Sequence, residues 1–212
     1  MNKSYQTGEA NMYSVSLHLK GKKVVVAGGG KIATRKIRSL LKEEANITVI
    51  SPHISEEILH WRTEKRIKVY EREVIPSDFK DAFLTFLATN DEALNEKLAR
   101  SLPPNQLVSV ASNYECGNFS VPAQLKRGKL SVAISTSGAS PSLAKEIRND
   151  LEILFSDEYI QYVEFLDQCR KIIKSLKVDH AQKETWLKLI VEERFKNEQE
   201  IREEFLAYIK QK

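Results

Sequence analysis

Residues 23–33 read KVVVAGGGKIA, a β-branched run that ends in three glycines and continues into a segment of helical character. Gly28, Gly30 and Ala33 match the G-x-G-x-x-G/A spacing of a dinucleotide-binding turn. Glycine at 28 permits a tight exit from the strand, and glycine at 30 lets the backbone approach a pyrophosphate at a helix N-terminus. The small Ala33 lets the helix pack closely on the strand. The stretch therefore predicts a dinucleotide site; an ordinary glycine turn at a strand–helix junction is the alternative.

The composition is that of a globular, water-soluble protein, with 42% hydrophobic and 29% charged residues among 212. No apolar run approaches the roughly 20 residues that cross a bilayer, so no membrane partner is expected. Met1–Asn11 is polar and lacks the apolar core of a secretory signal, so we expect a frayed extension or an early start of the chain. The two cysteines form no C-x-x-C pair, and the histidines lack ligand spacing. These features favour a cytoplasmic protein without a metal site.

The net charge of +4 arises before about residue 155, because acidic and basic residues nearly balance in the remainder. This excess favours anionic small molecules as partners. It is too small, and too little interleaved with aromatic residues, to indicate nucleic acid.

Strand-like and helix-like segments alternate over the first half of the chain. The expected strands are 24–27, 47–50, 67–70, 83–88 and 107–111, and the expected helices are 34–42, 56–61 and 91–100. Such alternation predicts an α/β fold, with a Rossmann-type parallel sheet and helices on both faces. We assign this nucleotide-binding domain to residues 12–112.

Two further regions follow. Residues 113–154 contain expected strands at 119–124 and 130–135, a basic turn at Lys126–Lys129, and a helix over 143–154 that Ser140 and Pro141 introduce. Residues 155–212 contain neither glycine nor proline, and their apolar spacing predicts three helices, with breaks near Val178–His180 and Lys196–Asn197. The expected domains are therefore a small α+β region and a C-terminal helical domain.

Ligands of parallel sheets bind beyond the carboxyl ends of the strands. Ser51, Pro52 and His53 follow the second strand without the acidic residue that usually binds ribose, so Ser51, His53 or backbone groups would serve instead. Thr89 follows the fourth strand, although Thr89-Asn90-Asp91 equally predicts a helix cap. His53 is equally consistent with an exposed loop residue.

A second anion site is expected after the strand at 130–135, where residues 135–141 read STSGASP. Hydroxyl and N–H groups before a helix suit carboxylates or phosphates, and Lys126, Arg127 and Lys129 lie nearby in sequence. A capped helix start is the alternative. The candidate substrate-binding residues are Lys126, Arg127, Thr136, Ser137, Gly138 and Ser140.

The motifs occur together in a known order. They are LKGKKVVVAGGGKIATRK at 19–36, ITVISP at 47–52, ATND at 88–91, VPAQ at 121–124 and STSGASP at 135–141. In these the chain resembles the precorrin-2 dehydrogenase / sirohydrochlorin ferrochelatase family, which includes the N-terminal module of siroheme synthase and stand-alone bacilli-type proteins. The resemblance extends from about Tyr13 to Asp150.

The resemblance implies NAD-dependent oxidation of precorrin-2, an anionic tetrapyrrole, to sirohydrochlorin. It also implies a homodimer, in which residues 113–154 form the dimer contact and much of the tetrapyrrole cleft. The family's dinucleotide contacts fall at Lys31 and Ile32 and at Pro52 and His53.

One position departs from the family pattern. Bifunctional members carry an aspartate, associated with proton handling, where this chain has Ser112. Metal insertion removes two pyrrole protons, and a serine hydroxyl is a poor base, so dehydrogenation is expected and chelation is not. Ser112 is nevertheless the candidate catalytic position. The alternatives are a bifunctional dehydrogenase/ferrochelatase and, in another class, a non-catalytic nucleotide-sensing module. Thr136 stands where some members carry a phosphorylatable serine.

Overall fold

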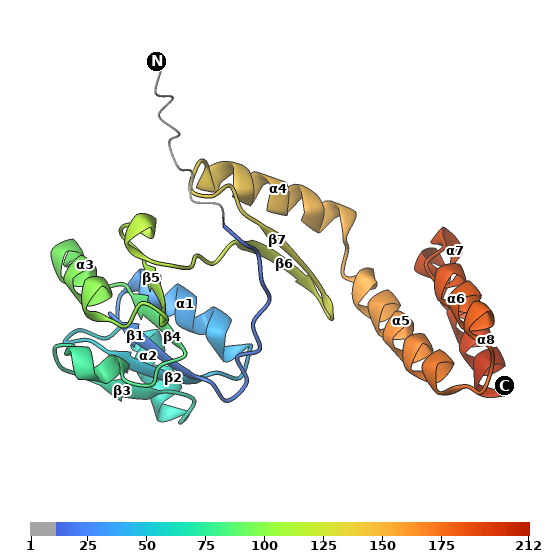
Figure 1. Ribbon diagram of the computed structural model, residues 1–212, viewed down its shortest axis with the longest axis horizontal. Coiled ribbons are helices and arrows are strands. Elements are labelled where there is room, and N and C mark those ends of the chain that lie inside the picture. The colour runs from blue at the N-terminus through green and yellow to red at the C-terminus, as the bar shows by residue number, and fades with distance from the viewer. Residues whose placement is uncertain (1–11) are drawn as a thin grey trace, which may run out of the picture. The chain divides into compact units, whose positions relative to one another are not determined.

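The computed structural model describes residues 12–212, so the expectation for Met1–Asn11 lies outside the described residues. The chain divides into two compact units, with the boundary between Val121 and Pro122 (Figure 1). The finer boundaries expected at 112/113 and 154/155 stay predictions.

The first unit contains a five-stranded sheet in the order β3-β2-β1-β4-β5, and every neighbouring pair is parallel. The strands are β1 Lys23–Ala27, β2 Asn46–Ile50, β3 Lys68–Tyr70, β4 Leu84–Leu87 and β5 Leu107–Val110. The helices are α1 Lys31–Leu41, α2 Glu56–Thr63 and α3 Glu92–Ser101. The predicted Rossmann-type α/β fold is confirmed, and α1 begins three residues earlier than expected.

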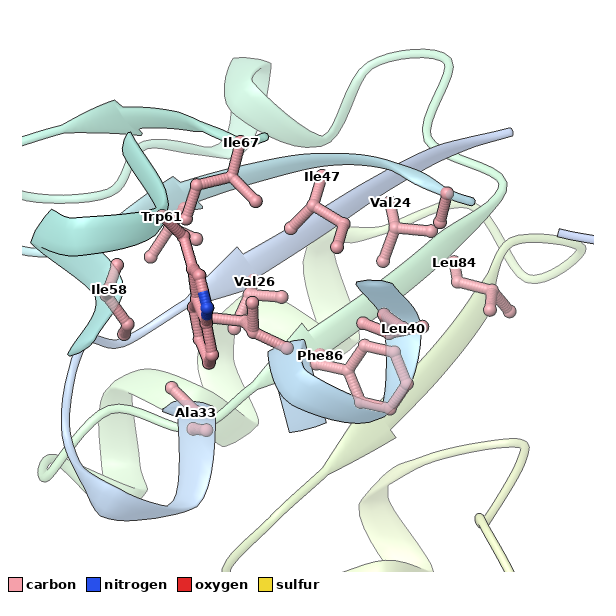
Figure 2. Close-up of a cluster of buried hydrophobic side chains, with 14 residues drawn as sticks. Val24, Val26, Ala33, Leu40, Ile47, Ile58, Trp61, Ile67, Leu84 and Phe86 are labelled. Atoms are coloured by element: carbon pink, nitrogen blue, oxygen red, sulfur yellow. The ribbon is translucent and has the colours of Figure 1, made fainter. Parts of the chain in front are cut away.

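Alternate side chains of β1 enter two separate cores, because successive residues of a strand point to opposite faces. Val24 and Val26 pack with residues of α1 and α2, among them Leu40 and Trp61 (Figure 2). Val25 belongs to the core on the other face. All these strand residues are fully buried, as in parallel sheets covered on both faces. This central strand therefore fixes the position of the glycine turn that follows it.

The second unit begins with an antiparallel hairpin of β6 Ala123–Arg127 and β7 Leu130–Ile134, followed by α4 Pro141–Leu154. The prediction of a strand at 119–124 was wrong, because β6 begins only at Ala123. Phe119 instead packs edge-on against Phe86 in the first unit, with ring centres 5.4 Å apart. Lys126 and Arg127 therefore belong to β6, and the turn expected at 126–129 is reduced to Gly128 and Lys129, with a positive φ of 57° at Gly128.

Four helices complete this unit, where three were expected. They are α5 Glu158–Ser175, α6 His180–Leu189, α7 Glu193–Asn197 and α8 Gln199–Lys210. The missed break follows α6, where the Tyr162 hydroxyl donates to the Ile190 carbonyl at 3.2 Å. Phe195 of α7 then stacks on Phe165, with ring centres 5.6 Å apart. Burial in the same core raises the pKa of the Cys169 thiol to about 12.

No helix within residues 12–212 is both long enough and apolar enough to cross a membrane. Over the same residues, no group of three or more His, Cys, Asp or Glu side chains is arranged to hold a metal ion.

Candidate functional site

The three glycines after β1 have different surroundings. Gly28 has a φ of +119°, and a Cβ there would lie 2.2 Å from the Ala88 carbonyl oxygen. A Cβ on Gly29 would lie 2.2 Å from the His53 carbonyl oxygen. A Cβ on Gly30 would meet no atom within 4 Å. Gly28 and Gly29 are thus required for packing, and Gly30 leaves open space at the start of α1. The requirement at Gly29 was not predicted from the sequence.

Gly30 is the N-cap of α1 and offers no side chain to the N–H groups of the first turn. The N–H groups of Lys31, Ile32 and Ala33 form no hydrogen bond with any residue in the described part of the chain. The first turn contains no acidic residue. Free N–H groups and the helix dipole attract anions at this position. The open start of α1 therefore fits the pyrophosphate of a dinucleotide.

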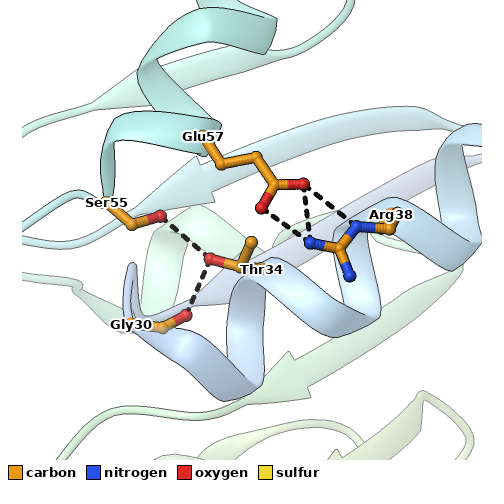
Figure 3. A network of polar contacts seen from close by, with 5 residues as sticks. All are labelled: Gly30, Thr34, Arg38, Ser55 and Glu57. Atoms are coloured by element: carbon orange, nitrogen blue, oxygen red, sulfur yellow. Dashed lines mark hydrogen bonds and ion pairs between the residues drawn. The ribbon is translucent and has the colours of Figure 1, made fainter.

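Hydrogen bonds join the glycine turn to the loop after β2 (Figure 3). The Thr34 hydroxyl contacts the Ser55 hydroxyl at 2.9 Å and donates to the Gly30 carbonyl at 3.0 Å. The Ser55 N–H donates to the Gly29 carbonyl at 2.9 Å. Beyond them, Arg38 of α1 forms an ion pair with Glu57 of α2 at 2.7 Å. This network was not predicted, because its partners are 19 and 21 residues apart.

The loop after β2 contains three predicted cofactor-binding residues. Pro52 and His53 are exposed, and Ser51 is buried. The Ser51 hydroxyl donates to the His53 carbonyl at 2.9 Å, so it shapes the loop. Its contact with ribose stays a prediction.

The loop after β4 caps the next helix. The Asp91 carboxylate accepts a hydrogen bond from the Leu94 N–H at 2.9 Å, so the helix-cap interpretation is confirmed. The Thr89 hydroxyl donates to the side-chain carbonyl of the fully buried Asn95 at 2.7 Å. The hydroxyl is thus already engaged, and a cofactor contact by Thr89 stays a prediction.

Ser112 is exposed in the loop after β5. The next residue, Asn113, donates from its amide to the Glu96 carboxylate of α3 at 3.3 Å. Burial and then the Glu96 charge raise the pKa of the Cys116 thiol in the same loop. The Glu96 carboxylate of α3 therefore lies beside this loop. Sequence reasoning missed it, because Glu96 and Asn113 are 17 residues apart.

The three basic residues of the hairpin have different environments. Arg127 donates to the Phe155 carbonyl at 2.9 Å and pairs with Asp157 at 3.2 Å. Lys129 forms an ion pair with Asp167 of α5. Lys126 is exposed on β6. Arg127 and Lys129 hold the hairpin on the helices that follow, so their expected contact with substrate stays a prediction.

The hydroxyl-rich loop after β7 uses several of its polar groups internally. Ser140 caps α4, because its hydroxyl accepts a hydrogen bond from the Leu143 N–H at 3.2 Å. The Thr136 hydroxyl accepts one from the Ser140 N–H at 3.1 Å. The turn passes through positive φ values of 49° at Ser137 and 88° at Gly138. The capped helix start is confirmed, and a substrate-binding role for this loop stays a prediction.

Three family models match successive parts of the chain. The model described as "Putative NAD(P)-binding" covers residues 15–123. The model of the sirohaem biosynthesis protein central domain covers 127–153, and that of the SirC C-terminal domain covers 159–205.

Individual relatives match over most of their length. The precorrin-2 dehydrogenase of Priestia megaterium is 41% identical over 93% of this chain and 98% of its own. That of Bacillus subtilis (strain 168) is 39% identical over 76% of this chain and 99% of its own. A solved structure of SirC, a precorrin-2 dehydrogenase, has 41% identity and a TM-score of 0.85 over 95% of this chain and 100% of that chain. The chain therefore belongs to the precorrin-2 dehydrogenase family.

Proposed function

We propose that this protein is an NAD-dependent precorrin-2 dehydrogenase, which oxidises precorrin-2 to sirohydrochlorin. The observation that carries the proposal is the open start of α1. Gly30 leaves open space at the start of this helix, and the N–H groups of Lys31 and Ile32 form no hydrogen bond with the described residues. Relatives that share 39–41% of the sequence over three-quarters or more of this chain bear the same activity in their names.

The protein's part in the reaction is to bind and orient. The N–H groups at the start of α1 would hold the pyrophosphate, and the loop at Pro52 and His53 would contact the dinucleotide. The chemistry that bound NAD would supply is that of a hydride acceptor. The accompanying proton passes to water or to a substrate carboxylate, so oxidation requires no strong protein base.

The residues after β5 support dehydrogenation without metal insertion. Ser112 supplies a hydroxyl where insertion would need a group able to remove pyrrole protons. Glu96 lies beside this loop, but its carboxylate is engaged by Asn113. The expected absence of chelatase activity is part of the proposal.

A homodimer is supported by α4. Leu143, Ile147 and Leu154 are 36–64% exposed, and their spacing of four and seven residues places them on one face of the helix. An apolar helix face of this kind is typical of a surface that another chain covers. A cytoplasmic location and the absence of a nucleic-acid partner complete the proposal; both free cysteines suit a reducing compartment.

The proposed function is tested by mixing the purified protein anaerobically with precorrin-2, with and without NAD. The absorbance spectrum should change to that of sirohydrochlorin only when NAD is present. A nucleotide-sensing module would bind NAD and leave the tetrapyrrole spectrum unchanged, and that result would contradict the proposal.

A further inference from the structure

Lys36, on the flank of α1, is a half-buried cation that lacks an anionic partner. Its Nζ lies 5.8 Å from the centre of the Phe86 ring. Burial and then the neighbouring Arg35 lower the pKa of this lysine. No carboxylate within residues 12–212 forms an ion pair or hydrogen bond with it.

Some other cations of the first unit have a carboxylate partner. Arg38, two residues further along α1, pairs with Glu57, and Lys20 pairs with Glu44 at 2.7 Å. Partial burial removes water from the ammonium group, and without an anionic partner the free-energy cost of this desolvation is not fully offset. The face of an aromatic ring offsets only part of this cost. Lys36 is therefore an unfavourable residue for stability alone, which is typical of positions kept for a ligand.

Lys36 also lies close to the edge of the sheet where ligands bind. Phe86 is the penultimate residue of β4, next to the carboxyl end of that strand. Ile32 precedes Lys36 by four residues, so both lie on the same flank of α1. Ile32 is 46% exposed and belongs to the first turn of the helix. The backbone of Lys36 lies about 8 Å along the helix axis from that of Lys31, at a rise of about 1.5 Å per residue.

We propose that Lys36 binds a carboxylate group of the tetrapyrrole. This inference rests on the proposed function and adds a substrate contact to it. Precorrin-2 and sirohydrochlorin carry carboxylates on flexible side chains, and one of them would supply the negative charge that Lys36 lacks. The pyrophosphate would bind at the N–H groups of Lys31 and Ile32, whose backbones precede that of Lys36 by about one helical turn or more. Loss of Lys36 should therefore weaken tetrapyrrole binding and leave NAD binding intact.

The test compares Lys36→Met with the wild type and with Lys42→Met. Methionine retains an unbranched apolar stem that can pack on Phe86, and it removes the charge. Lys42 is the C-cap of the same helix, at the end remote from the glycine turn, and serves as the matched control. Equilibrium titration with sirohydrochlorin, followed by its absorbance, and titration with NAD are measured for each protein. Thermal unfolding confirms that each variant is folded.

Lys36→Met should bind sirohydrochlorin about tenfold more weakly and raise the KM for precorrin-2 by a similar factor. Its NAD affinity should stay within twofold of the wild type, and its Tm should be equal or higher. Lys42→Met should match the wild type throughout. Unchanged sirohydrochlorin affinity, or an equal loss of NAD affinity, would overturn the inference.

If Lys36→Met does not fold, Lys36→Gln replaces it with the same expected results. The two proposals can fail separately. If the wild type oxidises precorrin-2 and the Lys36 variant binds tetrapyrrole normally, only this inference fails. If the wild type does not oxidise precorrin-2, the proposed function fails.

Discussion

The hydroxyl groups of Thr34 and Ser55 lie 2.9 Å apart and join α1 to the residue that precedes α2. Thr34 is buried and also bonds to the Gly30 carbonyl, while Ser55 bonds through its N–H to the Gly29 carbonyl. The glycine turn and the loop after β2 are thus held together. Because both loops are proposed to contact the cofactor, this pair orients the two halves of one binding site.

Thr34→Val should remove both side-chain hydrogen bonds and leave the Ser55 hydroxyl without its partner. We expect a loss of about 1–2 kcal/mol in stability, because a buried polar group loses its hydrogen bond. NAD affinity should fall several-fold, since the two loops lose their link. Thr63→Val is the matched control, because the Thr63 hydroxyl also bonds a helix carbonyl but is exposed. Titration with NAD and thermal unfolding measure both effects; unchanged NAD affinity in Thr34→Val would contradict the role assigned to this pair.

Substitutions of the basic residues of the hairpin should have two different effects, one on stability and one on the KM for precorrin-2. Arg127→Ala removes a largely buried guanidinium that bonds the Phe155 carbonyl and pairs with Asp157, so the free energy of unfolding should fall by about 2 kcal/mol. Lys126→Ala, at an exposed side chain, should lower stability less than Arg127→Ala does and should raise the KM for precorrin-2. That increase should shrink at high salt, because charges are screened over about 10 Å at 0.1 M. A normal KM for Lys126→Ala at low salt would show that Lys126 does not contact precorrin-2.

The exposed face of α4 should carry the dimer contact. Ile147→Asp places a charge at the centre of the face formed with Leu143 and Leu154, and should convert a dimer to a monomer. Asn149→Asp is the matched control, because it adds the same charge on another side of α4. Sedimentation velocity at micromolar concentration measures the change. A fully active wild-type monomer, or an Ile147→Asp protein that stays dimeric, would be inconsistent with the proposed interface.

Ser112 should matter little for dehydrogenation. Ser112→Ala should change the rate by less than about tenfold, which corresponds to about 1.4 kcal/mol, because no strong base is lost. The wild type should insert iron or cobalt into sirohydrochlorin no faster than the uncatalysed reaction. A clear enzyme-dependent acceleration would mean that another group, such as Glu96, supplies the base. The single-activity proposal would then be withdrawn.

The sheet could be predicted because its pattern is local. Most of its strands are short apolar runs, and β1 with its glycine turn carries the clearest signal of the fold. Phe119 shows the limit of this reasoning. The residues around it in the sequence resemble a strand, but its ring packs against Phe86, which lies 33 positions earlier in the chain. Only a tertiary contact distinguishes the two outcomes.

The candidate site was predicted less completely than the fold. Gly28 and Gly30 could be identified from their spacing, and the Asp91 cap from its residue type. The bonds between Thr34 and Ser55 and between Asn113 and Glu96 could not, because each joins side chains that only the folded sheet brings together. The break before α7 was missed for the same reason: Phe195 docks on Phe165, and no glycine or proline marks the change of direction.

A substitution at Gly30 should change NAD binding without changing the stability of the fold. Its φ of −88° and ψ of −168° are accessible to other residues, and a Cβ there meets no atom within 4 Å. Gly30→Val should therefore fold and obstruct the pyrophosphate. Gly28→Ala should instead destabilise the protein, because its Cβ would collide with the Ala88 carbonyl and its φ is positive.

NAD-dependent dehydrogenation is measured most directly as the amount of NADH formed when precorrin-2, NAD and protein are mixed anaerobically. The wild type should produce one NADH for each sirohydrochlorin. Folded Gly30→Val should bind NAD poorly and produce no NADH above the background without protein. Sirohydrochlorin formed by the wild type without matching NADH, or a wild-type rate in folded Gly30→Val, would contradict the assignment of this glycine turn to an NAD-dependent dehydrogenase.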